Sequence, residues 1–123
     1  MTNANIQINV RTPSPKVAIL DIHGEINSYA ENAIMDAYTQ SSSAGANAII
    51  LNFEGLDYMN SSGIGSIIAA HTTYSKGGGL VKLTGLNSNV HNLFVVTKLI
   101  DIFDVYDSLD EAIDSFVKQN LSK

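Results

Sequence analysis

A short stretch near the middle of the chain, Ala48 to Phe53 (AIILNF), forms a nearly unbroken apolar run. Such a run is typical of a strand that is covered on both faces, as the central strands of parallel sheets are. Apolar residues recur three and four positions apart from Ser28 to about Ser43, and again after Ser61, which predicts an amphipathic helix on each side of this strand. A strand between two helices indicates an α/β domain in which helices cover a largely parallel sheet.

The chain begins with two segments that predict an antiparallel pair of strands. Ile6 to Val10 (IQINV) alternates apolar and polar residues, and Lys16 to Gly24 (KVAILDIHG) is a denser apolar run. Between them, Thr12 to Pro15 (TPSP) contains two prolines, each of which lacks a backbone N–H. We expect this stretch to be the hairpin connection rather than part of the ladder, and the first strand to lie at an edge of the sheet.

Further segments continue the alternation of strand and helix. Leu80 to Gly85 (LVKLTG) and Asp101 to Asp107 (DIFDVYD) predict two more strands, and a helical pattern follows each of them. The predicted fold over residues 1–123 is therefore a single α/β domain with a mixed, mostly parallel β-sheet, an antiparallel N-terminal edge strand and about four α-helices. Loops that leave the carboxyl ends of parallel strands share one rim, so GEINS (24–28) and DYMNSSG (57–63) are expected to lie together.

Charge and cysteine content narrow the classes of function. There are 12 acidic residues against 7 basic ones, and the formal net charge of -5 argues against direct binding to nucleic acid. The absence of cysteine excludes disulfides and thiolate metal sites. The first residues show no basic, apolar leader, and the apolar runs are far shorter than the roughly 20 residues that span a bilayer. We expect a cytoplasmic protein with neither a membrane nor a nucleic acid as direct partner.

The chain lacks the motifs of common hydrolases and nucleotide-binding loops. A nucleophile elbow has the order G-x-S-x-G, whereas in SSGIG (61–65) both glycines follow the serines. The GGG of SKGGGLVK (75–82) is not followed by the Lys and Ser or Thr of a P-loop, so it predicts a turn. His23, His71 and His91 lie in separate segments without ligand spacing. We therefore expect no metal site, no cofactor and no catalytic residue.

The strongest candidate for a functional site is the stretch Asp57 to Ser66 (DYMNSSGIGS), which places adjacent serines and two glycines between a predicted strand and a predicted helix. A helix cap accounts for one serine, with Ser61 at the N-cap and Ser62 at the first helical position. It does not account for Gly63 and Gly65, because a glycine inside a helix costs about 1 kcal/mol relative to alanine. The glycines indicate a close approach to the backbone at a helix N-terminus, where unpaired N–H groups favour an anion such as phosphate.

This stretch and its flanks resemble the STAS family, the sulfate transporter and anti-sigma factor antagonist domain. LNFEGLDYMNSSGIGSIIAAHTTYSKGGG (51–79) is similar to the family's signature, in which a strand, a D-x-[ML]-[DN]-S-[ST]-G-[LI]-G loop and a helix follow in that order. LDIHGEIN (20–27) resembles the family's second strand and its G-E-[LI]-[DN] loop, and LVKLTGLNSNVHNLFVVTKLIDIFDVYDSLDEAI (80–113) resembles its closing segment. The resemblance runs from about Ile6 to about Val117.

The resemblance implies a stand-alone anti-sigma factor antagonist in a partner-switching circuit. In that family an ATP-dependent anti-sigma factor serine/threonine kinase phosphorylates the first serine of the pair, and a metal-dependent serine phosphatase restores it. The unphosphorylated form binds the anti-sigma factor and frees a sigma factor. Carried onto this chain, the phosphorylation site is Ser61, where a phosphate would add about -1.5 to -2 units of charge to an exposed rim. The residues expected to contact the partner on this rim are Glu25, Asn27, Ser28, Tyr58, Asn60, Ser62, Gly63 and Gly65.

One position departs from the family pattern, and the sequence allows two alternative functions. Asn60 stands where the family often has Asp, which removes one negative charge from the loop. The first alternative is a STAS-type regulatory module that binds another protein or a small ligand without modification of Ser61. The second, a small enzyme with Ser61 as nucleophile, is disfavoured because the sequence places no acid-base pair beside it.

Overall fold

The computed structural model describes residues 6–27, 29–76 and 78–118, and within these ranges six strands form one sheet. The strands are β1 (Ile6–Ser14), β2 (Val17–Ile26), β3 (Ala48–Asn52), β4 (Leu56–Met59), β5 (Leu80–Thr84) and β6 (Asp104–Tyr106). The helices are α1 (Glu31–Ser43), α2 (Ser61–Lys76), α3 (Ser88–Val96) and α4 (Leu109–Lys118), and a 3-10 turn, η1 (Leu99–Asp101), precedes β6. The expected α/β class with a mixed sheet and four helices is confirmed.

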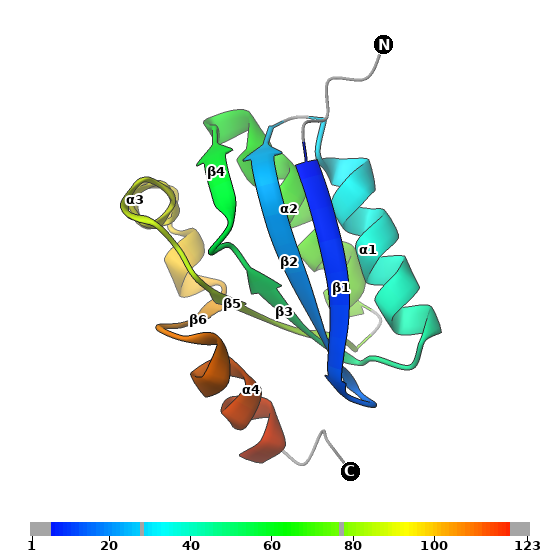
Figure 1. Ribbon diagram of the computed structural model, residues 1–123. Coiled ribbons are helices and arrows are strands. Elements are labelled where there is room, and N and C mark those ends of the chain that lie inside the picture. The colour runs from blue at the N-terminus through cyan, green and yellow to red at the C-terminus, as the bar shows by residue number, and fades with distance from the viewer. Residues whose placement is uncertain (1–5, 28, 77, 119–123) are drawn as a thin grey trace.

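The sheet is parallel except at the edge that β1 forms. Its order is β1-β2-β3-β5-β6, and only β1 and β2 are antiparallel, as the sequence predicts for an N-terminal edge strand. The long strand β2 has two neighbours on the side away from β1, because Val17 to Asp21 pair with β3 and Gly24 to Ile26 pair with β4. The sheet therefore forks, and β4 lies beside the carboxyl half of β2 (Figure 1).

Three details of the predicted sheet are wrong. The first strand does not end before the prolines but continues to Ser14, which pairs with Val17. The register shifts between Arg11 and Ser14, and such an irregularity on an edge strand accommodates a Pro13 that has no N–H to donate. The strand β4 was not predicted, because only its first and last residues are buried and no alternation marks it. The last strand is shorter than expected, since Asp101 belongs to η1.

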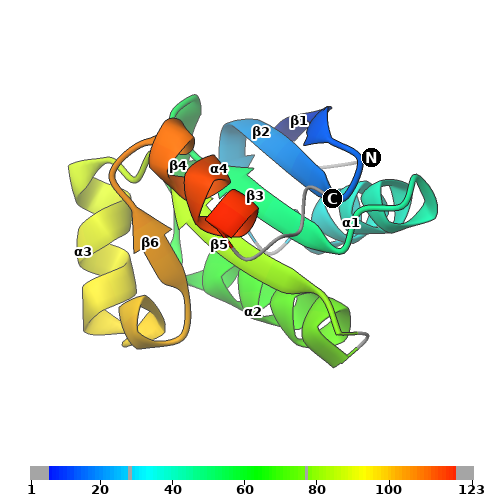
Figure 2. The same ribbon diagram turned by 90° about the horizontal axis from the view of Figure 1, so that it is seen from below.

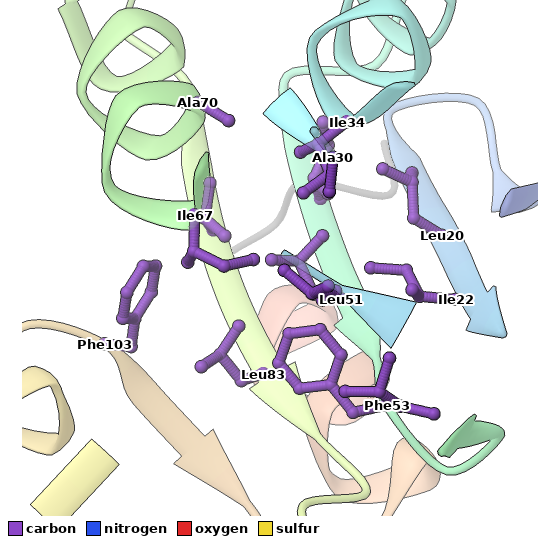
Figure 3. Close-up of a cluster of buried hydrophobic side chains, with 14 of the residues drawn as sticks. Leu20, Ile22, Ala30, Ile34, Leu51, Phe53, Ile67, Ala70, Leu83 and Phe103 are labelled. Carbon is purple, nitrogen blue, oxygen red and sulfur yellow. The ribbon is translucent and has the colours of Figure 1, made fainter. Parts of the chain in front are cut away.

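Helices cover the two faces of the sheet unequally. Figure 2 shows α1 and α2 on one face and α4 on the other. The larger core lies under α1 and α2, where buried side chains of β2, β3 and β5 meet those of both helices (Figure 3). A smaller core under α4 is formed by Val17, Ile19, Ala48, Ile50, Ala112 and Phe116. All of β3 is buried, as the apolar run that starts at Ala48 predicts for a central strand.

Candidate functional site

The rim at the carboxyl ends of β2 and β4 brings two loops together. The two strands are parallel neighbours, with Glu25 paired to Tyr58 and Ile26 to Met59, so both end at the same side of the sheet (Figure 1). One backbone bond joins the loops directly, because the N–H of Asn60 donates to the carbonyl of Ile26 at 3.2 Å. The described part of the first segment, GEIN (24–27), and DYMNSSG (57–63) therefore lie side by side, as expected for loops that leave parallel strands.

Asn60, rather than Ser61, caps helix α2. Its side-chain oxygen Oδ1 accepts a hydrogen bond from the N–H of Gly63 at 2.8 Å, and its backbone carbonyl accepts from the same N–H at 3.0 Å. Ser61 is the first helical residue, so the expectation that it occupies the N-cap is wrong. Asparagine is as good an N-cap as serine, and it takes this role here. The hydroxyls of Ser61 and Ser62 are thereby left for other uses, and both residues are exposed.

The two glycines of the first turn of α2 serve different purposes. Gly63 is buried against β2, where a Cβ would overlap the carbonyl oxygen of Ile26 and lie 2.7 Å from its carbonyl carbon. The close approach inferred from the sequence is therefore made by the protein's own backbone at this position. Gly65 is exposed, and a Cβ there would meet nothing within 4 Å. Only Gly65 leaves bare helix backbone facing outward, where a partner has access.

The loop between β2 and α1 is held firmly to helix α2. The carbonyl of Asn27 accepts hydrogen bonds from the hydroxyl of Ser66 at 3.0 Å and from the N–H of Ala30 at 3.1 Å. The side-chain oxygen of Asn27 accepts from the N–H of Tyr29 at 2.8 Å. Ser66 and Ala30 are both buried. These bonds fix Asn27, Tyr29 and Ala30 relative to the helix whose first residue is Ser61.

The side chains of the expected contact residues differ in exposure. Those of Ser61, Ser62 and Tyr58 are exposed, as is Gly65, and Tyr58 reaches 52%. Glu25, Asn27 and Asn60 are half-buried, Gly63 is buried, and Ser28 lies outside the described residues.

Two residues of this rim have a role that the sequence did not predict: Ser66, the last residue of the candidate stretch, and Tyr29. Ser66 is a single polar residue in the apolar stripe of α2, and that interruption was the available signal. Tyr29 is an aromatic residue in a connection between strand and helix, and it is 57% exposed.

The rim carries acidic side chains, but the N-terminus of α2 on the same rim favours an anion. Asp57 is exposed and Glu25 is half-buried beside Tyr58. The start of a 16-residue helix carries a partial positive charge, and its first N–H groups have no partners within the helix. A phosphate on Ser61 would lie at this helix end within its own molecule, while an approaching partner would meet its negative charge.

A hollow of about 450 Å³ lies at the fork of the sheet, away from the serine pair. Among its lining residues, Asp21 accepts hydrogen bonds from Arg11 at 2.5 and 2.9 Å and from the side-chain amide of Asn52 at 2.8 Å. Burial alone would raise the pKa of Asp21, but the bonds from Arg11 and Asn52 outweigh it and the pKa lies below its ordinary value. These polar groups bind one another and hold β1, β2 and β3 in register.

The described ranges contain neither a candidate metal site nor a membrane-spanning helix. No group of three or more His, Asp or Glu side chains within these ranges is arranged to hold a metal ion. No helix among the described residues combines the length and the apolar character needed to cross a bilayer. His71, one of the three histidines of the sequence, packs its ring against Phe103 with centroids 4.4 Å apart.

Comparison with known proteins identifies relatives over most of the chain. A family model described as the STAS domain matches residues 7–112. The anti-sigma-B factor antagonist of Bacillus subtilis (strain 168) is 29% identical over 101 residues, which cover 82% of this chain and 91% of that protein. The anti-sigma F factor antagonist of Paenibacillus polymyxa is 27% identical over 95 residues, which cover 75% of this chain and 80% of that protein.

The same fold is found in SpoIIAA, a Bacillus cell fate determinant and anti-sigma factor antagonist with two solved forms. The unphosphorylated form matches with a TM-score of 0.69 and 22% identity, and the match covers 91% of this chain and 97% of SpoIIAA. The phosphorylated form matches with a TM-score of 0.67 and 21% identity, and the match covers 89% of this chain and 99% of SpoIIAA.

Proposed function

The chain belongs to the STAS domain family, and we propose that it is an anti-sigma factor antagonist whose binding to its partner is switched by phosphorylation of Ser61. Two relatives that match most of this chain carry the name of anti-sigma factor antagonist. The observation that carries the proposal is the position of Ser61, an exposed hydroxyl at the first residue of α2 beside the β2–α1 loop. SpoIIAA, which shares the fold, exists in an unphosphorylated and a phosphorylated form.

In the proposed cycle the unphosphorylated rim binds an anti-sigma factor that is also a serine/threonine kinase. The kinase transfers the γ-phosphoryl group of ATP to the Ser61 oxygen, ADP leaves, and the hydroxyl proton goes to a base of the kinase. A serine phosphatase removes the phosphate by hydrolysis and restores the binding form. This chain catalyses neither step, needs no cofactor of its own and works in the cytoplasm, where sigma factors act.

Electrostatics explains why one phosphate is enough to switch binding. Placed at the N-terminus of α2, the dianion is compatible with the fold, because the helix end favours negative charge. Placed in a contact, the same group has to be desolvated, and it faces any acidic side chains of the partner. The rim already contains Asp57 and Glu25 in a protein of net charge -5, so the phosphate adds to an existing negative field.

The other contact residues fit this role by position. Tyr58, Ser62 and Gly65 offer exposed groups close to Ser61, while Asn60 holds the helix start and Gly63 lets α2 approach β2. Asn60 also preserves the shape of the loop without the negative charge that Asp would bring.

Phosphorylation in vitro tests the proposal. The purified protein is incubated with ATP and the anti-sigma factor kinase that co-purifies with it from its own cell, and the modified residue is located by mass spectrometry. We expect one phosphate on Ser61, none on a Ser61→Ala variant, and loss of the complex in gel filtration after phosphorylation. An unmodified Ser61 in a protein that still binds a regulator would favour the alternative, a STAS-type module that works without this modification.

A further inference from the structure

Tyr29 is a large aromatic side chain that the fold itself does not bury. It is 57% exposed, although the next residue, Ala30, is fully buried in the main core. Large exposed aromatic side chains on a rigid support are typical of protein contacts, because their area is available to a partner without reorganisation.

The backbone that carries Tyr29 is fixed from two directions. Its N–H donates to the side chain of Asn27 at 2.8 Å, and the carbonyl of Asn27 is bound by the buried hydroxyl of Ser66 in α2. The following N–H, that of Ala30, donates to the same carbonyl at 3.1 Å. The backbone of Asn27, Tyr29 and Ala30 is therefore held by hydrogen bonds before any partner arrives, so binding through Tyr29 costs little backbone entropy.

Tyr29 lies within reach of a partner that covers Ser61. Ser66, which holds the loop, is five residues along α2 from Ser61, a separation of about 7.5 Å along the helix axis. A contact of standard size buries roughly 800 Å² on each partner, which corresponds to a radius of roughly 16 Å. A contact of this size centred on Ser61 is wide enough to include Tyr58, Asn27 and Tyr29, since Asn27 is bound both to Ser66 and to the N–H of Tyr29.

We propose that Tyr29 is an anchor residue of the partner contact, with its ring in an apolar pocket of the anti-sigma factor and its hydroxyl at the wet margin of that pocket. This inference rests on the proposed function, and it assigns part of the affinity for the anti-sigma factor to Tyr29. Tyrosine combines a large apolar ring with a polar end, which suits a residue that is half in water before binding. Tyr29 then contributes to the affinity for the anti-sigma factor, whereas phosphorylation of Ser61 decides whether the complex forms.

Binding measurements on surface variants test this assignment. The affinity of the unphosphorylated protein for its cognate anti-sigma factor is measured by calorimetry for the wild type, Tyr29→Ala, Tyr29→Phe and Leu80→Ala. Leu80 is the matched control, because it is an exposed apolar residue at the start of β5, at the opposite end of the parallel strands. We expect Tyr29→Ala to weaken binding about 30-fold, Tyr29→Phe to weaken it less than about fivefold, and Leu80→Ala to change it less than about twofold.

The outcomes separate this inference from the proposed function. Wild-type binding that is lost on phosphorylation, together with Tyr29→Ala affinity within about twofold of wild type, would overturn the anchor and leave the switch intact. A wild-type protein that binds no anti-sigma factor overturns both. Folding is checked by urea unfolding, and if Tyr29→Ala proves unstable, Tyr29→Arg is measured instead, since an exposed arginine keeps a long side chain but cannot enter an apolar pocket without desolvating its charge.

Discussion

Gly63 of α2 lies directly against the carbonyl group of Ile26 in β2, with no room for a side chain between them. Alanine at position 63 would force the helix away from the sheet, a form of overpacking that costs typically 1–3 kcal/mol. The better helix propensity of alanine offsets about 1 kcal/mol of this overpacking cost. Because the clash is with backbone rather than with a flexible side chain, the cost lies in the upper part of that range, at about 2–3 kcal/mol, and we expect Gly63→Ala to lower the free energy of unfolding by about 1–2 kcal/mol in urea denaturation. A variant as stable as the wild type would contradict the contact with Ile26.

Gly65 offers the opposite test in the same turn of helix. A Cβ at this position meets nothing within 4 Å, so alanine adds helix propensity without a clash. We expect Gly65→Ala to raise the free energy of unfolding by about 0.5–1 kcal/mol, measured in the same urea series. A loss of stability would show that the outer face of α2 is less open than the structure indicates.

Asn60 is predicted to stabilise α2 as its N-cap. Asn60→Ala removes the side-chain oxygen that binds the N–H of Gly63, and we expect a loss of about 1 kcal/mol in the free energy of unfolding. Asn60→Asp is the matched control, because its carboxylate keeps the cap and favours the helix N-terminus. Thermal and urea unfolding of the two variants compare them directly. Equal loss in both would mean that the amide group, rather than the accepting oxygen, matters at this position.

The charge of residue 61 is expected to control partner affinity. Ser61→Ala adds no charge to the rim and should bind the anti-sigma factor about as well as the unphosphorylated wild type. Ser61→Asp places a carboxylate where it must be desolvated in the contact, and we expect at least about tenfold weaker binding. Both variants should unfold at nearly the wild-type urea concentration, because Asn60 and not Ser61 caps the helix. Indistinguishable affinities of the two variants would count against an electrostatic switch.

Some of this molecule can be derived from the sequence because the controlling interactions are local. The apolar run that starts at Ala48 predicts a central strand, and that strand is buried throughout. The rim follows from parallel strands alone, since their carboxyl ends must lie together.

Other features depend on contacts between segments that are distant in the chain. Asn60 and Ser61 are both good N-caps, and the neighbouring sequence does not decide between them. The reason for Gly63 is the backbone of Ile26, which no pattern around residue 63 reveals. The backbone of Tyr29 is held by Asn27, and Asn27 is bound by Ser66, which belongs to a segment that approaches it only in the folded chain.

His71 should make stability depend on pH in the weakly acidic range. Its ring packs on Phe103, its Nδ1 is buried without a hydrogen-bond partner among the described residues, and burial lowers its pKa. Below about pH 6.5 the imidazole of the unfolded chain takes up a proton more readily than that of the folded protein. The stability that neutral His71 contributes is therefore fully present above this pH and is lost as the pH falls. His71→Phe keeps an aromatic ring and removes the titration. The free energy of unfolding, measured in urea at pH 7.5 and 5.5, should fall more in the wild type than in His71→Phe, by at most about 1.4 kcal/mol per pH unit. Equal changes in the two proteins would mean that water reaches the imidazole freely.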